Sequence, residues 1–230
     1  RGILTKVEAR EAMDRITPVC EKIPLREGDL VIEAIVERIG AKRSLFAELD
    51  GRAPEGVPFA TNTSSLSVDS MSVAMKNRGR LGGLHFFNPV HRMELIEVIR
   101  AEHTDPAVTQ ALLDFVRRIG KRAVLCKDSP GFLVNRILVP YLVEAAILWE
   151  NGHRTEEIDG AMLDFGMPMG PATLADLTGI DINYKVNKTF EKRLGERYKV
   201  HPLTEVIYNT GCYGRKTGTG YFDYSGEKPV

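Results

Sequence analysis

His85 and Glu97 are the two residues whose types and surroundings best suit acid–base chemistry. His85 ends an apolar segment that predicts a β-strand, and two phenylalanines and Asn88-Pro89 follow it. An imidazole in apolar surroundings can be tuned as a general base. Spacing alone leaves two interpretations open, because a histidine at this position can also be a structural residue of the core.

Glu97 is a candidate partner for that base. It lies between Ile96 and Val98 in a second predicted strand, where an unpaired carboxylate is costly. The alternative is a strand with one wet face, since Glu94 is also charged. However, positions 94 and 97 point to opposite faces of a regular strand. If Glu94 faces water, Glu97 therefore faces the interior.

Small polar side chains form a third group of candidates. Asn62-Thr63-Ser64-Ser65 directly follows the strand-like run VPFAT at 57–61, where these groups could bind a ligand or only cap the next helix. Asn135 lies in an apolar helical segment, and a buried amide needs partners. For Asn135, hydrogen bonding between helices and substrate binding both remain open. The other four histidines lie beside charges, turns or a proline, and we expect them at the surface: His91, His103, His153 and His201.

The elements that must position these residues alternate in the first part of the chain. Short apolar runs predict strands at 30–36, 57–62, 81–87, 93–99 and 123–127, and the segments at 1–15, 40–50, 67–75 and 105–119 predict helices. This alternation predicts an α/β sheet that is at least partly parallel. Sites in such sheets lie beyond the carboxyl ends of strands, which is where His85 falls.

After Asp128 the sequence predicts almost only helices. We expect Ser129 to cap, and Pro130 to open, a long helix that runs to Trp149. This helix is apolar nearly all round, so it must be buried nearly all round, and another subunit is the expected partner. The Gly- and aromatic-rich segment 213–225 predicts a loop or short hairpin. We place a domain boundary between residues 1–127 and 128–230.

Composition excludes several classes of protein. The 230 residues include 31 basic and 31 acidic side chains, so no excess of cations is present to bind a polyanion such as nucleic acid. No run approaches the ~18 apolar residues of a membrane span. The three cysteines are widely spaced without a CxxC motif, which disfavours a disulfide framework or a zinc site and indicates a reducing compartment. We expect no nucleic-acid partner, no membrane span and no metal.

Several segments, taken together and in order over essentially the whole chain, resemble the 3-hydroxyacyl-CoA dehydrogenase family. The most specific are GLHFFNP at 83–89 and DSPGFLVNR at 128–136. HFFNPVHRM is most similar to the dehydrogenase part of multifunctional fatty-acid oxidation proteins. The resemblance implies a Rossmann-type doubly wound sheet followed by an all-α C-terminal domain. It also implies oxidation of (S)-3-hydroxyacyl-CoA to 3-oxoacyl-CoA in fatty-acid β-oxidation, by hydride transfer to NAD+.

The resemblance also assigns roles to residues. His85 would be the base that takes the proton of the 3-hydroxyl, and Glu97 would hold the imidazole. Ser64 and Asn135 would hydrogen-bond the substrate's oxygen atoms. The family's cofactor-contacting positions correspond to Glu37, Lys42, Ser64, Asn88 and Lys216. The family further implies a homodimer through the helical domain, or linked domains of a multifunctional chain. It implies a cytoplasmic location for a bacterial protein, and a mitochondrial or peroxisomal one for a eukaryotic protein.

The sequence departs from the family at its beginning. No GxGxxG fingerprint is present, and the family's first strand, Gly-rich turn and ribose-binding acid would precede Arg1. We therefore expect an incomplete Rossmann-type sheet. Two alternatives to the acyl-CoA dehydrogenase follow: a non-catalytic, dimerising fragment that no longer binds NAD, or a dehydrogenase for a 3-hydroxy acid that carries no coenzyme A.

Overall fold

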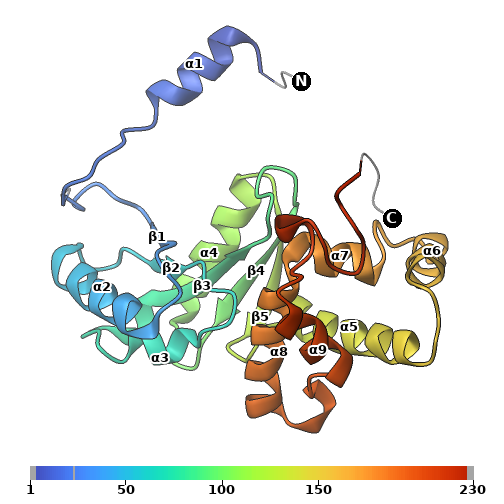
Figure 1. Ribbon diagram of the computed structural model, residues 1–230. Coiled ribbons are helices and arrows are strands. Elements are labelled where there is room, and N and C mark those ends of the chain that lie inside the picture. The colour runs from blue at the N-terminus through green and yellow to red at the C-terminus, as the bar shows by residue number, and fades with distance from the viewer. Residues whose placement is uncertain (1–3, 23, 227–230) are drawn as a thin grey trace.

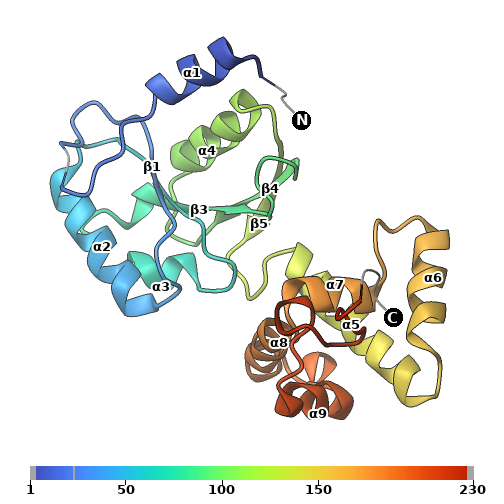
Figure 2. The ribbon, with the colours of Figure 1, turned by 45° about the horizontal axis from the view of Figure 1, so that its top comes forward.

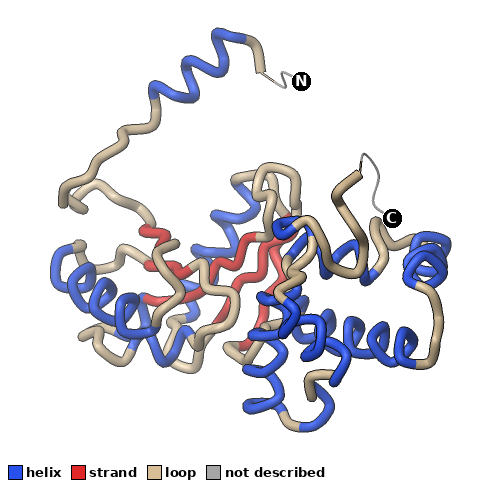
Figure 3. Tube along the Cα trace, in the orientation of Figure 1, coloured by secondary structure: helices blue, strands red, loops and turns tan. Residues whose placement is uncertain are grey.

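The protein has two regions that lie side by side (Figures 1 and 2). The computed structural model describes residues 4–22 and 24–226. Up to Lys127 the chain forms the sheet region, and from Asp128 it forms the helical region (Figure 3). None of the described helices is long and apolar enough to cross a lipid bilayer.

Within the described residues, five strands form one sheet in the order β1-β2-β3-β4-β5. The strands are β1 (Val31–Glu33), β2 (Phe59–Thr61), β3 (Leu81–Phe86), β4 (Leu95–Arg100) and β5 (Arg122–Lys127). β3 and β4 are antiparallel, and the other neighbours are parallel. The predicted α/β fold with a partly parallel sheet is confirmed.

Helices cover both faces of this sheet. α2 (Ile39–Arg52) and α3 (Val68–Ser72) pack on one face, and α4 (Pro106–Arg118) packs on the other. Successive residues of β2 face opposite sides of the sheet, since Phe59 packs with α2 and α3 while Ala60 packs with α4. The sheet is therefore doubly covered, as the Rossmann-type class requires.

The amino-terminal helix α1 (Lys6–Asp14) lies apart from the sheet and buries none of its residues. Thr5 and Glu8 form reciprocal hydrogen bonds at its start, which satisfies backbone groups that the first turn leaves unpaired. The helix predicted at 1–15 is confirmed from Lys6 to Asp14, and residues 1–3 lie outside the described residues.

The pairing of β3 with β4 brings the two acid–base candidates together. Their register sets His85 directly opposite Glu97. β4 begins at Leu95, two residues later than predicted, so Glu94 precedes the strand. The side chain of Glu94 is 71% exposed and that of Glu97 is 0% exposed. The expected contrast between the two glutamates is confirmed.

The helical region confirms the prediction of helices after residue 128. Its helices are α5 (Val134–Glu150), α6 (Thr155–Phe165), α7 (Pro171–Thr178), α8 (Ile180–Leu194) and α9 (Pro202–Thr210), with short 3-10 turns at η2 (Glu196–Tyr198) and η3 (Arg215–Thr217); a third, η1 (Arg78–Arg80), precedes β3. The segment after α9 is a loop with isolated bridges, and buried Asp176 accepts hydrogen bonds from the backbone N–H groups of Tyr221 and Phe222.

The predicted start of the long helix is wrong. α5 begins at Val134, not at Pro130, because Gly131 and Phe132 adopt positive φ values of 73° and 47°. Ser129 therefore does not cap the helix. Pro140 lies inside α5 without breaking it. Within this single chain α5 buries only part of its surface, and Ile137 is 64% exposed.

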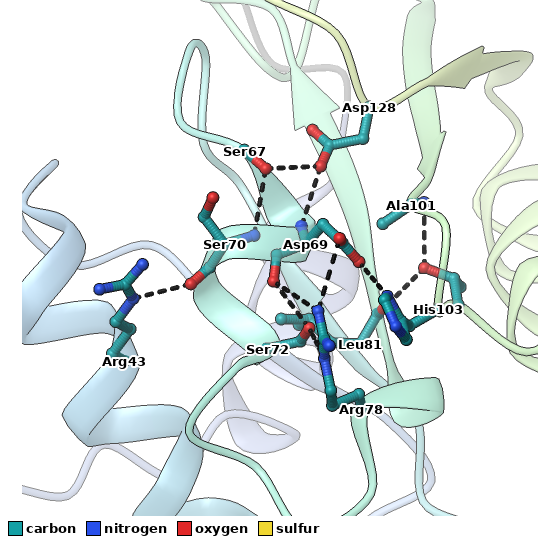
Figure 4. Close-up of polar contacts among 11 residues, drawn as sticks. Arg43, Ser67, Asp69, Ser70, Ser72, Arg78, Leu81, Ala101, His103 and Asp128 are labelled. Carbon is teal, nitrogen blue, oxygen red and sulfur yellow. Dashed lines mark hydrogen bonds and ion pairs between the residues drawn. The ribbon is translucent and has the colours of Figure 1, made fainter.

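A polar network ties the linker between the two regions to α3 (Figure 4). One carboxylate oxygen of Asp128 accepts hydrogen bonds from the Ser67 hydroxyl at 2.8 Å and the Asp69 N–H at 2.9 Å. The Ser67 oxygen in turn accepts the N–H of Ser70. The acid at the end of β5 thus caps the amino end of a helix in the sheet region, where a negative charge is favourable.

Candidate active site

The centre of the site is a buried histidine–carboxylate pair. Nδ1 of His85 lies 2.6 Å from Oε2 of Glu97, and the two side chains are 8% and 0% exposed. The rings of Phe87 and Phe132 pack against the imidazole, with centroid distances of 4.6 and 5.7 Å. This enclosure keeps water away from the hydrogen bond and fixes the plane of the ring.

The second oxygen of Glu97 binds the start of the helical region. Oε1 accepts hydrogen bonds from the N–H groups of Leu133 and Val134, each at 2.8 Å. The positive φ at Gly131 and Phe132 turns the chain so that these two N–H groups face the carboxylate. Glu97 therefore caps α5 from the other region of the molecule, at the end of the helix whose dipole favours an anion.

These contacts determine the ionisation of Glu97. Burial alone would raise the pKa of its carboxyl group. The hydrogen bonds from His85 and from the two backbone N–H groups outweigh burial and hold this pKa below its usual range. An ionised carboxylate can only accept, so Nδ1 of His85 carries a proton, and in the neutral ring Nε2 then carries the lone pair. Among the described residues, no group hydrogen-bonds to Nε2, which leaves this nitrogen able to accept a proton.

Cys126 is a neighbour of this pair that the sequence did not reveal. Its Sγ atom lies 3.9 Å from Oε1 of Glu97. Burial, and then the charge of Glu97, raise the pKa of this thiol to about 11. A thiol with so high a pKa is neither a nucleophile nor a base at neutral pH. Cys126 is therefore part of the packing around Glu97.

Ser64 and Asn135 line a common cavity of about 210 Å³. Asn135 belongs to the first turn of α5, directly after a residue that binds Glu97. Ser64 belongs to the loop after β2, which is held beside the end of β3 because Asn62 Oδ1 accepts the N–H of Phe86 at 3.0 Å. Residues of both regions line this cavity, and His85 is not among them.

Three of the predicted cofactor residues form one cluster at the carboxyl ends of β1 and β2. Nζ of the buried Lys42 lies 3.2 Å from Oε2 of Glu37 and 2.7 Å from Oε1 of Glu33. Oε1 of Glu37 accepts the N–H of Ser64 at 3.2 Å and the hydroxyl of Thr63. Glu33 is 3% exposed, and sequence reasoning missed it. Like Glu97, Glu33 lies within an apolar strand, and this position in the sequence could have indicated a buried, paired carboxylate.

The other two predicted cofactor residues lie elsewhere. Asn88 is exposed in the turn that follows β3, directly before a cis peptide bond to Pro89. Lys216 lies in the helical region, where its ammonium group pairs with Asp181 and lies over the ring of Tyr213. The structure therefore does not bring Lys216 to the cluster around Glu37.

The remaining histidines lie mostly at the surface. His91, His103 and His153 are exposed, as expected. His201 differs, since its side chain is 10% exposed, accepts the N–H of Leu203 at the start of α9, and lies 3.2 Å from Glu150. The expectation of a solvated surface was wrong for His201, because helix capping draws its ring inward.

Asp69, Glu102 and His103 form the one group in the described chain whose ligand atoms could meet at a metal ion. Asp69 already binds Nδ1 of His103 at 2.7 Å and the guanidinium of Arg78 at 3.4 Å (Figure 4). The guanidinium of Arg78 already neutralises the negative charge of Asp69 that would attract a metal ion. We therefore interpret this group as a surface ion-pair network.

The class of protein is defined by three features together: a mostly parallel sheet covered on both faces, a histidine–carboxylate pair at the end of a strand, and a helical second region. These are the features of two-domain α/β dehydrogenases that bind a dinucleotide. Residues 1–129 match the NAD-binding domain of 3-hydroxyacyl-CoA dehydrogenases, and residues 131–224 match their C-terminal domain. The chain belongs to the 3-hydroxyacyl-CoA dehydrogenase family, which confirms the resemblance of its motifs.

Individual proteins agree with this assignment. The chain is 43% identical to a probable 3-hydroxyacyl-CoA dehydrogenase of Caenorhabditis elegans, over 92% of this chain and 70% of that protein. It is 37% identical to the fatty acid oxidation complex subunit alpha of Vibrio parahaemolyticus, over 99% of this chain but 32% of that subunit. The structure of 3-hydroxybutyryl-CoA dehydrogenase from Escherichia coli matches with a TM-score of 0.94 and 36% identity, over 100% of this chain and 49% of that one.

Proposed function

We propose that this chain carries the dehydrogenase chemistry that oxidises (S)-3-hydroxyacyl-CoA to 3-oxoacyl-CoA, with NAD+ as the acceptor. The observation that carries the proposal is the His85–Glu97 pair, in which Nδ1 is held at 2.6 Å while Nε2 is left to receive a proton. The family assignment supports the same reaction. The enzyme would serve fatty-acid oxidation, since the Vibrio relative bears that name.

In this reaction His85 acts as the general base. Nε2 takes the proton of the 3-hydroxyl as the hydride leaves C3, so that the C–O single bond becomes a carbonyl. Glu97 stabilises the imidazolium that forms, as a carboxylate does for other histidine bases. The Ser64 hydroxyl and the Asn135 amide orient the oxygen atoms of the substrate. Much of the rate comes from this positioning, because hydride donor and acceptor must meet in a narrow range of geometries.

NAD+, when bound, accepts the hydride. The residues present fit this cofactor, because the ends of neighbouring parallel strands, here β1 and β2, are where α/β sheets bind nucleotides. There the half-exposed Glu37 and the exposed Ser64 offer hydrogen-bonding groups beside the ammonium of Lys42. Glu37, Lys42, Ser64 and Asn88 would hold the cofactor. A contact with Lys216 stays a prediction of the family resemblance.

Two measurements test the proposal. Fluorescence titration with NADH should give saturable binding, and turnover should be observed with 3-hydroxyacyl-CoA thioesters and not with the free 3-hydroxy acids. Equal turnover of thioesters and free acids would favour a dehydrogenase for acids without coenzyme A. Absence of saturable NADH binding would favour a non-catalytic fragment.

We infer three further properties of the molecule. Residues 1–127 and 128–230 form separate domains, of which residues 1–3, 23 and 227–230 lie outside the described residues. The partner is a second copy bound through the helical domain, or linked domains such as those that the name of the Vibrio relative implies. The compartment is the cytoplasm of a bacterium, or the mitochondrion or peroxisome of a eukaryote.

A further inference from the structure

A buried carboxylate at the end of β1 takes no part in the proton transfer. The side chain of Glu33 is 0% exposed, and both of its oxygen atoms accept hydrogen bonds. Oε1 accepts the N–H of Ile35 at 2.6 Å and the ammonium of Lys42 at 2.7 Å. Oε2 accepts the hydroxyl of Thr61, on the neighbouring strand β2, at 2.6 Å. Glu33 therefore does not touch a ligand itself, and any functional effect passes through these partners.

Stability alone is a weak reason for the buried pair of Glu33 and Lys42. Taking two charges out of water costs about as much as their attraction returns, so apolar residues of similar volume would serve a core as well or better. What the pair does supply is direction. The stem of a lysine is flexible, yet the side chain of Lys42 is 1% exposed and its ammonium is held in one place.

The ammonium of Lys42 is shared between two carboxylates. Nζ lies 2.7 Å from Oε1 of Glu33 and 3.2 Å from Oε2 of Glu37. The side chain of Glu37 is 38% exposed, so it can meet a ligand. Because Glu33 is the nearer partner of the ammonium, Glu37 keeps its acceptor strength for other donors. Without the charge of Glu33, the ammonium would turn to Glu37 alone and draw this side chain inward.

Glu37 extends these contacts to Ser64. Its Oε1 atom accepts the hydroxyl of Thr63 and the N–H of Ser64, the latter at 3.2 Å. A carboxylate offers about four acceptor positions, so these two donors and Lys42 leave about one position for a ligand. Ser64 also lines the cavity between the two regions. The contacts thus form a continuous chain from the buried Glu33 to an exposed acceptor beside the cavity.

We propose that Glu33 is a positioning residue for the cofactor, and that it acts through the ammonium of Lys42 to hold Glu37 in the orientation that receives NAD+ beside Ser64. The inference rests on the proposed function, since it assigns a task to the residue behind the cofactor cluster. Loss of the Glu33 charge should therefore weaken cofactor binding. The proton transfer at His85 should stay intact, because neither His85 nor Glu97 contacts this chain of residues.

Glu33→Gln removes the charge and keeps the neutral contacts. The glutamine carbonyl can accept the N–H of Ile35, and its amide can donate to the hydroxyl of Thr61. In the full-length enzyme, titration with NADH should show binding about tenfold weaker than in the wild type, because a charge-assisted hydrogen bond is lost. The KM for NAD+ should rise to a similar extent, while kcat at saturating NAD+ should change little.

Asp50→Asn is the matched control. Asp50 also forms a buried ion pair in the sheet region, at 3.0 Å from Arg80, and its side chain is 2% exposed. Its other hydrogen bonds come from the backbone N–H groups of Lys76 and Asn77, outside the cofactor cluster. This variant should lose stability without a change in NADH affinity. Equal weakening of NADH binding in both variants would overturn the proposal, since loss of any buried charge in this region would then suffice.

A double-mutant cycle tests whether Glu33 acts through Lys42. Lys42→Met removes the ammonium that links Glu33 to Glu37. Addition of Glu33→Gln to Lys42→Met should therefore not weaken NADH binding further, so the fold changes of the single variants should not multiply. Fold changes that multiply would mean that the two residues act independently, which would overturn the proposal.

Thr61→Val is a milder variant that tests the same chain of contacts. It removes the donor to Oε2 of Glu33 at similar side-chain volume, and NADH binding should weaken about threefold. Thr109→Val, at a buried threonine of α4, should bind NADH as the wild type does. Wild-type affinity in both Glu33→Gln and Thr61→Val would overturn the proposal and leave the dehydrogenase intact. Absence of NADH binding in the wild type would contradict the proposed function itself.

Discussion

At the scale of single residues, Glu97 performs two tasks with two oxygen atoms. One oxygen holds the imidazole of His85, and the other holds the backbone of Leu133 and Val134. The sequence indicated that this glutamate was buried, because position 97 differs in parity from Glu94. It could not indicate the second task, because the two N–H groups come from a segment 36 and 37 residues away.

His85→Gln tests the base. Glutamine retains polarity but cannot take up a proton, so kcat should fall by ~10²–10⁴ while KM changes little. Steady-state kinetics with 3-hydroxybutyryl-CoA and NAD+ measure both constants. An unchanged kcat would remove His85 from the mechanism. Substitution of the exposed His91 by Gln is the matched control and should leave both constants unchanged.

Glu97→Gln tests the carboxylate. The variant lacks the negative charge that stabilises the imidazolium, so protonation of the base becomes harder. The acid limb of the pH–rate profile should therefore move to lower pH, together with a lower maximal rate. A profile that stays at the wild-type position would make Glu97 a structural residue only.

The same residue predicts how stability depends on pH. Because contacts in the folded state lower the pKa of Glu97 from 4.5, the stabilisation is fully present above pH 4.5. It is lost as the pH falls through the lower value of the folded state. Thermal unfolding followed from pH 7 to pH 3 should show this acid-side loss in the wild type and a smaller loss in Glu97→Gln.

Cys126 should resist alkylation in the folded protein. Its pKa of about 11 leaves little thiolate at pH 8, and the side chain is buried. Cys20 is exposed and serves as an internal control. Iodoacetamide labelling followed by peptide mass spectrometry should modify Cys20 first and Cys126 only after denaturation. Comparable labelling of both in the native protein would contradict the packing around Glu97.

At the scale of elements, the strands were predictable and one helix start was not. The short apolar runs predicted all five observed strands, and β3–β4 pairing then places His85 opposite Glu97. The start of α5 was misjudged because Ser129-Pro130 is a usual local signal for a helix start. The actual cap is a side chain from β4, and no local pattern encodes it.

The turn before α5 depends on Gly131. A Cβ atom there would lie 2.0 Å from the ring of Phe190, and the backbone has a φ of 73°. Gly131→Ala should therefore destabilise the protein by about 2–4 kcal/mol, from backbone strain and overpacking together. Gly152→Ala, with a φ of 88° and no neighbour within 4 Å, is the matched control for backbone strain alone. Urea denaturation should give a clearly larger loss at Gly131.

At the scale of the whole molecule, apolar side chains remain exposed on the helical region. Ile137 is 64%, Leu163 52% and Phe165 80% exposed. Homodimerisation through this region stays a prediction, and Phe165→Asp tests it. The variant should fold normally but sediment as a smaller species than the wild type at the same concentration. Identical sedimentation would place any partner on another surface.

The shared carboxylate has a consequence for motion between the two regions. Suppose that the helical region swings away to admit or release a ligand. Glu97 then loses the two backbone donors that help to lower the pKa of its carboxyl group, while His85 stays hydrogen-bonded to its other oxygen. The carboxylate therefore supports an imidazolium best when the two regions are in contact, so the contacts that join the regions also favour proton abstraction.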